Sequence, residues 1–193
     1  MTDNFKWPTP PQFTSPAGVN TTTGEDCLVV LNDGQKLLVS LLRFSPEYDL
    51  VEFLPNRDTA NTSIPLETVK NIRLVHPLVL KKQVDMLEMK GGEVFPASEK
   101  QSCEVEFWDG EKLIGETIGF VSDRQGLYLF LVNYGTSVIR YFVPTLAIRN
   151  YQIGKPLGQM LVDEAVATKK EIDAGLEKQQ QLRSQRIGDY LTA

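Results

Sequence analysis

The sequence predicts a mainly β protein with a C-terminal α segment, built from two tandem, duplicated small β-barrels followed by a helical module. The first observation is a stretch that occurs twice, at residues 27–37 and 103–113, each time as an apolar run, Asp-Gly and another apolar run. Asp-Gly between such runs favours a tight hairpin, and we expect a type I′ turn with positive φ at both central residues. Each stretch therefore begins a β module.

The match between the two stretches continues downstream, which is the second observation. Phe44 matches Phe120, and after a one-residue slip residues 50–54 match 127–131. Further on, the equivalent pairs are Ile64-Pro65 with Val143-Pro144, 69–71 with 148–150, and Pro77 with Pro156. Five short strands in each module would form a small barrel, which leaves no exposed sheet edge.

The third observation is the change of pattern along the chain. Prolines and threonines near the N-terminus indicate an extended or disordered lead, and helical spacing replaces β alternation near the C-terminus. The predicted divisions are a lead at 1–24, a first barrel at 25–77, a linker with room for a short helix at 78–101, a second barrel at 102–155 and a helical module at 156–193.

Composition is that of a soluble globular protein, with 41% hydrophobic and 23% charged residues and a net charge of −5. Six acidic and five basic residues fall in 27–77, and the same numbers fall in 103–156. This balance lacks the basic surface that phosphate backbones require, which argues against a nucleic-acid partner. Because no apolar run approaches the ~20 residues of a membrane span, we expect no membrane insertion and a cytoplasmic location.

Catalytic chemistry is not predicted. Cys27 and Cys103 each open an apolar strand and are interpreted as buried small hydrophobes rather than as a disulfide or a metal pair. The single histidine, His76, is interpreted as a surface residue. Phosphate-binding loops and the common hydrolase, metalloprotease and redox motifs do not occur. We therefore expect no enzyme, no catalytic residue, no metal ligand and no cofactor.

Each β module resembles the SH3-like and Sm-like small barrels. The resemblance is carried by the Asp-Gly hairpin, a long strand ending in Phe, and Ile-Pro-Leu ahead of a closing strand. RNA-binding Sm proteins place Asp and Asn where this sequence has Ser45 and Asp49, or Val121 and Gly126, so the RNA site is not carried over. In Sm rings the barrel edges pair between subunits, and the resemblance therefore also allows a homo-oligomer.

The tail shows helical spacing, with Leu157, Leu161, Val162 and Ala165 on one face. Thr168-Lys169-Lys170-Glu171 is a capping box, so a second helix should begin there and fray in the glutamine run 179–181. Residues 187–191 then restart the pattern of 157–161. A helical unit that restarts at this point cannot complete its own core, and it either packs on the barrels or belongs to a longer chain.

The tail also resembles the N-terminal domain of type II secretion and type IV pilus assembly ATPases, through its Leu-Gly, paired aliphatic, Ile, Leu and Gln spacing. Some members of that family bind cyclic di-GMP. The resemblance implies the ligand-binding residues Leu157, Gly158, Gln179, Arg186 and Gly188. Pro156 stands where the family has its first Arg, and Ala165 replaces a Gly.

Together these observations predict a non-enzymatic regulatory or adaptor module of bacterial type II secretion or type IV pilus machinery. It would act through protein partners, with cyclic di-GMP as a ligand of the helical segment. Two alternatives remain open at this point: an Sm-like RNA-binding protein, and a structural oligomer assembled through barrel edges.

Overall fold

The computed structural model describes residues 7–10, 13–14, 24–55, 61–79, 81–82, 95, 100–134, 137–155, 161–163 and 165–191. For Thr14, 81–82 and 183–191 it describes the backbone alone. The chain divides into two compact units, Met1–Ile153 and Gly154–Ala193. No helix among the described residues combines the length and the apolar character that crossing a membrane demands.

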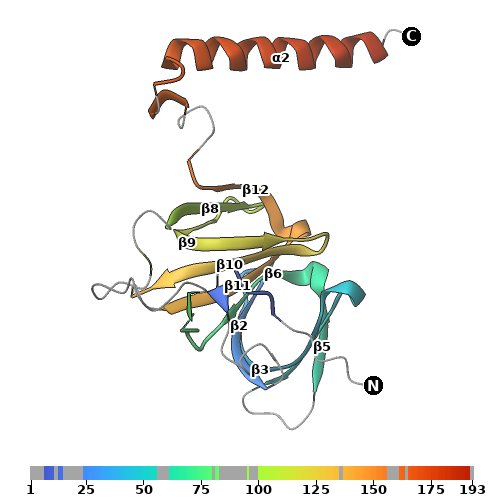
Figure 1. The fold of residues 1–193 in the computed structure, drawn as a ribbon. Helices are drawn as coiled ribbons and strands as arrows, with labels where there is room; N and C mark the ends of the chain where they lie inside the picture. Colours follow the sequence, from blue (N-terminus) through green and yellow to red (C-terminus); the bar gives the residue numbers. More distant parts are fainter. Residues whose placement is uncertain are drawn as a thin grey trace. The chain divides into compact units, whose positions relative to one another are not determined.

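A single antiparallel sheet of ten strands dominates the first unit (Figure 1), in the order β12-β8-β9-β10-β11-β6-β2-β3-β4-β5. A separate two-stranded ribbon pairs β1 (Phe13–Thr14) with β7 (Lys81–Lys82). The strands of the large sheet are β2 Glu25–Leu31, β3 Lys36–Ser45, β4 Leu50–Pro55, β5 Thr62–Pro65, β6 Val69–Leu74, β8 Gln101–Phe107, β9 Lys112–Ser122, β10 Gly126–Asn133, β11 Ser137–Pro144 and β12 Ile148–Ile153.

The sheet consists of two modules with the same internal order. In the first module, residues 25–74, the fifth strand β6 pairs with the first strand β2, and the fourth strand β5 lies at the far end. The second module, residues 101–153, repeats this order with β12, β8, β9, β10 and β11. A 3₁₀ turn connects the fourth and fifth strands of each module, at Leu66–Thr68 and Thr145–Ala147.

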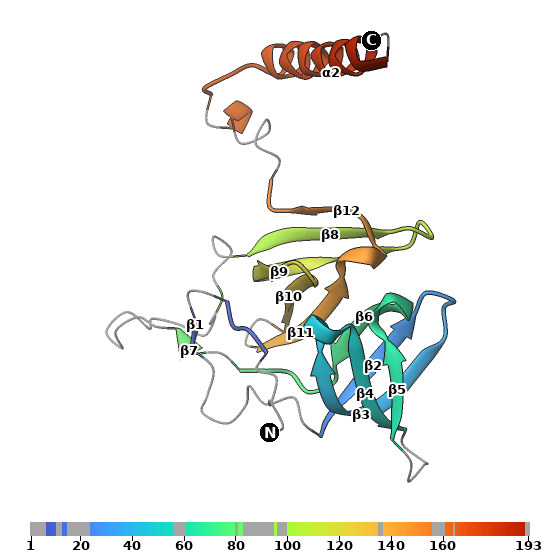
Figure 2. The same cartoon turned by 90° about the vertical axis from the view of Figure 1, so that its right-hand side faces the viewer.

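The two modules join edge to edge through β6 and β11, in the middle of the sheet (Figure 2). The prediction of a mainly β fold with a C-terminal α segment is confirmed. Two separate closed barrels are not confirmed, because the sheet is not closed and β6 uses its second edge to pair with β11. Such long-range edge pairing leaves no local trace in a sequence.

Both Asp-Gly hairpins differ from the predicted type I′ turn. In the first, the Gly34 amide donates to the Leu31 carbonyl (3.0 Å), the Leu31 amide donates to the Gln35 carbonyl (2.9 Å), and Gly34 has φ +86°. Asp33 is not among the described residues with positive φ. This is a three-residue loop, a type I turn followed by a left-handed Gly. The Asp33 carboxylate favours it by accepting the Gln35 amide at 2.9 Å.

A β-bulge interrupts the second strand of each module. The register of β3 with β4 shifts between Leu41 and Arg43, and that of β9 with β10 shifts between Leu129 and Leu131, opposite Ile118 and Gly119. Phe44 pairs with Val51 and is fully buried, whereas Phe120 pairs with Leu129 and is 38% exposed. The two phenylalanines that the sequence match aligns therefore differ in burial.

The larger hydrophobic core is shared by the two modules and by the N-terminal segment. Strand β10 is buried on both faces: Tyr128 and Phe130 face the shared core, while Leu127, Leu129 and Leu131 face a smaller core inside the second module. The second-module residues of the shared core are Ile118, Tyr128, Phe130, Val138 and Phe142. Neither module therefore has the large core to itself.

Two aromatic residues of the predicted lead belong to this shared core. Trp7 is fully buried and Phe13 almost fully. The Trp7 ring lies 5.6 Å from that of Phe44 in the first module and 5.5 Å from that of Tyr128 in the second. The N-terminal segment thus contacts both modules at once.

The second unit contains the helix α2 (Lys169–Leu191) and a helical turn at 161–163. The predicted capping box is confirmed: Thr168 donates from its amide and its hydroxyl to the Glu171 carboxylate, at 2.7 and 2.8 Å. The predicted fraying at 179–181 is wrong, since α2 continues through these glutamines to Leu191. Gln, Lys, Leu and Arg are good helix formers, which explains the continuation.

Candidate interaction site at the junction of the two modules

A β-bulge in the fifth strand of each module presents a basic residue. In β6, Val69 pairs with Leu31 and Asn71 with Val30, so Lys70 has no partner in β2. In β12, Ile148 pairs with Phe107 and Asn150 with Glu106, so Arg149 has no partner in β8. A bulge bends the strand and redirects the side chain of its extra residue. Lys70 and Arg149 are therefore structural equivalents.

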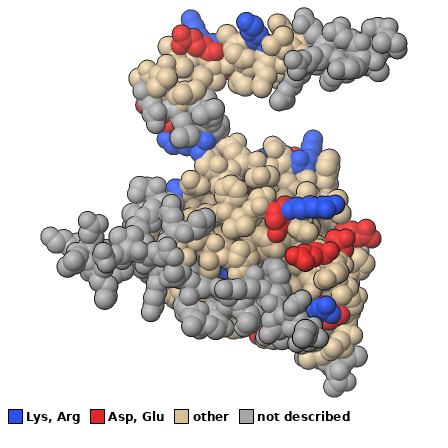
Figure 3. Space-filling model, turned by 45° about the vertical axis from the view of Figure 1, so that its right-hand side comes forward, with Lys and Arg blue, Asp and Glu red and all other residues tan. Residues whose placement is uncertain are grey.

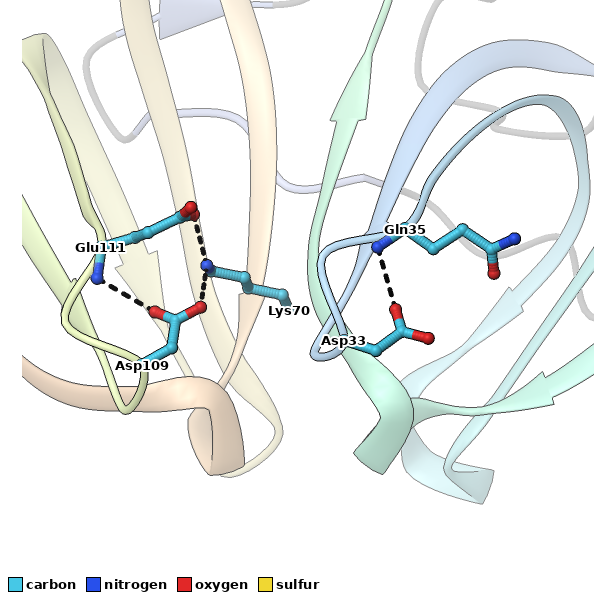
Figure 4. Close-up of polar contacts among 5 residues, drawn as sticks. All are labelled: Asp33, Gln35, Lys70, Asp109 and Glu111. Atoms are coloured by element: carbon cyan, nitrogen blue, oxygen red, sulfur yellow. Dashed lines mark hydrogen bonds and ion pairs between the residues drawn. The ribbon is translucent and has the colours of Figure 1, made fainter.

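Lys70 reaches from the first module to the hairpin turn of the second (Figure 4). Its ammonium group forms short ion pairs with the carboxylates of Asp109 and Glu111 and lies 4.8 Å from the centre of the Phe107 ring. The Lys70 side chain is 3% exposed, and those of Asp109 and Glu111 are 42% and 74% exposed. A buried cation is thus held by two carboxylates at the surface.

The hydrogen bonding of the turn orients the Asp109 carboxylate toward Lys70. Its Oδ1 accepts the Glu111 amide at 3.0 Å, which leaves Oδ2 to face Lys70. The hydrogen bonds from Lys70 and from the Glu111 amide lower the pKa of Asp109 below its ordinary value. Burial by itself lowers the pKa of Lys70, but the hydrogen bonds and charges of the two carboxylates outweigh burial and raise that pKa.

A second ion pair between the modules joins Arg140 of β11 to Glu25 of β2. The Arg140 side chain is almost fully buried and that of Glu25 is mostly buried. Burial raises the pKa of Glu25 despite the nearby guanidinium. Removing one partner of a buried pair is far more costly than replacing both, so this contact favours one alignment of the modules over others.

Beside Lys70 the junction opens into a groove of about 360 Å³. Trp108 and Leu146 of the second module line it, and they are 68% and 71% exposed. The remaining lining residues are Asn32, Lys70, Phe107, Asp109 and Ala147. Aromatic residues are enriched at the centres of protein interfaces, and an indole exposed next to an apolar side chain is a frequent anchor point.

Charges around the second module are interspersed. On the face drawn in Figure 3, basic and acidic side chains lie next to each other. Lys112 pairs with Glu104 at 2.6 Å and Arg149 with Glu106 at 3.0 Å. Such exposed pairs contribute about 0–1 kcal/mol each and can exchange partners readily.

The two cysteines are free and buried, as predicted. Burial raises the pKa of the Cys27 thiol to about 12 and that of Cys103 to about 11. His76 is exposed. Over the ranges that the structure describes, no three His, Cys, Asp or Glu side chains gather where they could hold a metal ion.

The residues predicted to bind cyclic di-GMP lie in the second unit. Leu157 and Gly158 fall outside the described residues. Gln179 is exposed on α2, and Arg186 and Gly188 belong to the same helix. Seven residues separate Gln179 from Arg186, which is roughly two turns or ~10 Å along one face of a helix. The Gly188 amide lies in the helix interior, where it donates to the carbonyl four residues earlier.

The motifs of the sequence did not predict a role for the junction residues Lys70, Trp108, Asp109, Glu111 and Leu146. A usable pattern was nevertheless present, because the internal match aligns Lys70 with Arg149 and Asp33 with Asp109. A basic residue kept at one position and an acidic residue kept at another indicate a repeated contact. Comparison of the chain with protein-family models, with curated proteins and with solved structures gave no match.

Proposed function

We propose that this chain is a non-enzymatic adaptor of bacterial type II secretion or type IV pilus machinery, in which two tandem SH3/Sm-like modules provide the contact surface. The groove beside Lys70 carries this proposal. It combines two exposed apolar side chains, Trp108 and Leu146, with a framework fixed by buried ion pairs. A rigid surface with an exposed aromatic anchor can bind a protein without losing much conformational freedom.

The partner's chemistry follows from the rim of the groove. Asp109 lines the groove, and the Lys70 ammonium that it contacts also pairs with Glu111. This cluster of two carboxylates and one ammonium group is net negative and adjoins the apolar side chains of Trp108 and Leu146. The partner we propose is a protein segment that inserts an apolar side chain between Trp108 and Leu146 and carries a basic residue toward Asp109 or Glu111.

Site-specific photo-crosslinking tests this function. The photoreactive amino acid benzoylphenylalanine replaces Trp108 in the full chain, produced in its native cells, and crosslinked products are identified by mass spectrometry. Leu38 is the matched control, because it is an apolar residue of β3 that is 54% exposed and lies outside the groove. The expected product is an adduct to a secretion or pilus protein at position 108 and none at position 38.

Two results would overturn the adaptor proposal. One is an adduct pattern that is the same at positions 108 and 38. The other is a crosslink from position 108 solely to further copies of this chain. In the supporting case, Leu146→Ala reduces the yield of the adduct at position 108 several-fold, since it removes the second apolar wall of the groove.

Cyclic di-GMP binding by the tail is the regulatory part of the same proposal. Its support is the spacing of Leu157, Gly158, Gln179, Arg186 and Gly188, in which Arg186 would pair with a phosphate. Isothermal titration calorimetry with cyclic di-GMP, and with cyclic di-AMP and GTP as controls, tests it. Selective binding of cyclic di-GMP that is lost in Arg186→Ala would support the role of Arg186 in the site. Equal affinity for cyclic di-GMP in the wild-type chain and in Arg186→Ala would exclude Arg186 from the site.

A further inference from the structure

The two Asp-Gly turns have the same internal geometry. Gly34 and Gly110 both have positive φ, at +86° and +84°. In each turn Oδ1 of the aspartate, Asp33 or Asp109, accepts the amide of the residue two positions later, at 2.9 and 3.0 Å. A Cβ atom added to either glycine would meet nothing within 4 Å, so space is open beside both turns. Chemistry that depends on the turn alone should therefore proceed equally at both.

The surroundings of the two aspartates differ (Figure 4). Lys70 of β6 forms a short ion pair with Oδ2 of Asp109, so both oxygens of this carboxylate are held. Asp33 is exposed, and within the part of the chain that the structure describes no lysine or arginine forms an ion pair with it. Arg149, the equivalent of Lys70, pairs with Glu106. Asp109 is therefore held through two oxygens and Asp33 through one.

An aspartate followed by glycine can cyclise and open again with water as the sole co-reactant. The main-chain nitrogen of the glycine attacks Cγ of the aspartate, an N–Cγ bond forms, and a carboxyl oxygen leaves as water with the carboxyl proton and the amide proton. Water then opens the five-membered succinimide at either carbonyl. Opening at one carbonyl restores aspartate, and opening at the other gives isoaspartate, in which the main chain runs through the former side chain. Glycine favours the attack because no side chain crowds its nitrogen.

We propose that Asp33-Gly34 is a site of spontaneous isoaspartate formation and that Lys70 protects Asp109-Gly110 from the same reaction. The contact of Lys70 with one of two otherwise equivalent turns carries this proposal. The modification requires no partner protein, so the proposal goes beyond the adaptor function and does not depend on it.

Lys70 protects Asp109 in two ways. Cyclisation consumes the protonated carboxyl group, and an ammonium group next to the carboxylate favours the ionised form. The lowered pKa of Asp109 agrees with this effect. The ion pair to Oδ2 and the amide hydrogen bond to Oδ1 also restrict rotation of the carboxylate, and so oppose the approach of Cγ to the Gly110 nitrogen. Asp33 has one of these restraints, the hydrogen bond to Oδ1.

Isomerisation of Asp33 would change the groove at the junction of the modules. It adds one carbon atom to the main chain inside a tight, hydrogen-bonded turn. Asn32, the preceding residue, lines the groove and donates from Nδ2 to the Glu67 carbonyl at 2.7 Å. A longer main chain at position 33 displaces this contact. The reaction thus alters the first-module wall of the groove, while the second-module wall at Asp109 is protected.

Oxygen-18 labelling of the full chain tests the proposal. The protein is kept at about 37 °C and about pH 5 in water enriched in oxygen-18, because more aspartate is protonated there than at pH 7. Each opening of a succinimide adds one solvent oxygen, so proteolysis in ordinary water and fragmentation by mass spectrometry locate the label. The expected result is label and isoaspartate at Asp33, with labelling at Asp109 at least fivefold slower.

Two controls separate the Asp-Gly chemistry from the turn. Asp123 is exposed and its Oδ1 also accepts the amide two residues later, at 2.9 Å, but Arg124 follows it. Asp123 should gain label far more slowly than Asp33, and equal rates would overturn the succinimide route. In guanidinium chloride Asp33 and Asp109 should gain label at equal rates, because unfolding removes the contact with Lys70. A fivefold difference that persists in the unfolded chain would overturn the role of Lys70.

Removing the ammonium group should open Asp109 to the reaction. In Lys70→Ala the labelling rate at Asp109 should rise to within about twofold of the rate at Asp33, which should stay unchanged. Lys70→Met keeps most of the apolar length of the buried side chain and provides the same test if circular dichroism shows that Lys70→Ala is unfolded. The proposal is overturned by equal labelling of the two sites in folded wild-type protein, by an absence of label at Asp33, or by an Asp109 rate that does not rise in a folded Lys70 variant.

Discussion

Lys70 and Arg149 occupy the same bulge of two equivalent strands, yet Lys70 is buried against two carboxylates while Arg149 is more than half exposed. The local structure around the two residues is the same, so the difference comes from what lies next to each strand. Strand β6 has the second module as its neighbour, and β12 is the outermost strand of the sheet among the described residues. This difference in neighbours accounts for the burial of Lys70 at the internal junction.

The energetic consequence can be measured with two matched substitutions. Lys70→Ala should lower the free energy of unfolding by about 2 kcal/mol, because it removes a buried side chain and its ion pairs. Arg149→Ala should change it by no more than about 0.5 kcal/mol, because exposed pairs contribute little. Urea denaturation at low protein concentration measures both values. Equal losses in the two variants would contradict the different burial of the two side chains.

The Lys70–Asp109 pair should also make stability depend on pH. The pKa of Asp109 is lowered in the folded state, so its contribution is present above the ordinary Asp pKa and is lost as pH falls through the folded value. The pKa of Lys70 is raised, so its contribution is lost only as pH rises through a value above 10.5. Wild-type protein should therefore have a higher melting temperature than Asp109→Asn at pH 7, and this difference should shrink as pH falls below the ordinary Asp pKa. A difference in melting temperature that is as large at acid pH as at pH 7 would contradict this account.

Glycine substitutions separate a crowded site from an open one. A Cβ atom at Gly126 would lie 2.5 Å from the Val143 carbonyl oxygen and 2.6 Å from the Phe142 ring, so Gly126→Ala should destabilise the protein by about 1–3 kcal/mol. At Gly175, inside α2, nothing lies within 4 Å of the added Cβ. Gly175→Ala should raise helix content slightly, because Ala favours a helix by about 1 kcal/mol over Gly. Circular dichroism melts measure both, and a neutral Gly126→Ala would show that β10 can move away from β11.

The buried thiols should be unreactive in the native protein. Raised pKa values near 12 for Cys27 and 11 for Cys103 leave little thiolate at pH 8, and burial blocks reagent access. Ellman's reagent should modify neither cysteine over the time in which it modifies both in guanidinium chloride. If Ellman's reagent modified the cysteines of the native protein as fast as those of the denatured protein, the burial of Cys27 in β2 and Cys103 in β8 would be contradicted.

Strand content and the equivalence of the modules could be predicted from the sequence, since hairpins, bulged strands and the Ile-Pro-Leu turn depend on local residues. The turn type was missed because Asp-Gly fits both a type I′ turn and a type I turn with a left-handed Gly. The match of Phe44 with Phe120 did not predict their difference in burial, because Phe44 belongs to the shared core whereas Phe120 is 38% exposed. The continuous sheet and the burial of Lys70 arise from edge pairing between distant strands, which local patterns do not encode.

Hydrogen–deuterium exchange tests most directly the central claim that β6 and β11 join the two modules into one sheet. Amides of β6 and β11 should be protected in dilute as well as in concentrated protein, because their partners belong to the same chain. Lys70→Ala should weaken this protection, since it removes the ion pairs that connect β6 to the second hairpin. Rapid exchange of the β6 and β11 amides in wild-type protein would contradict the claim.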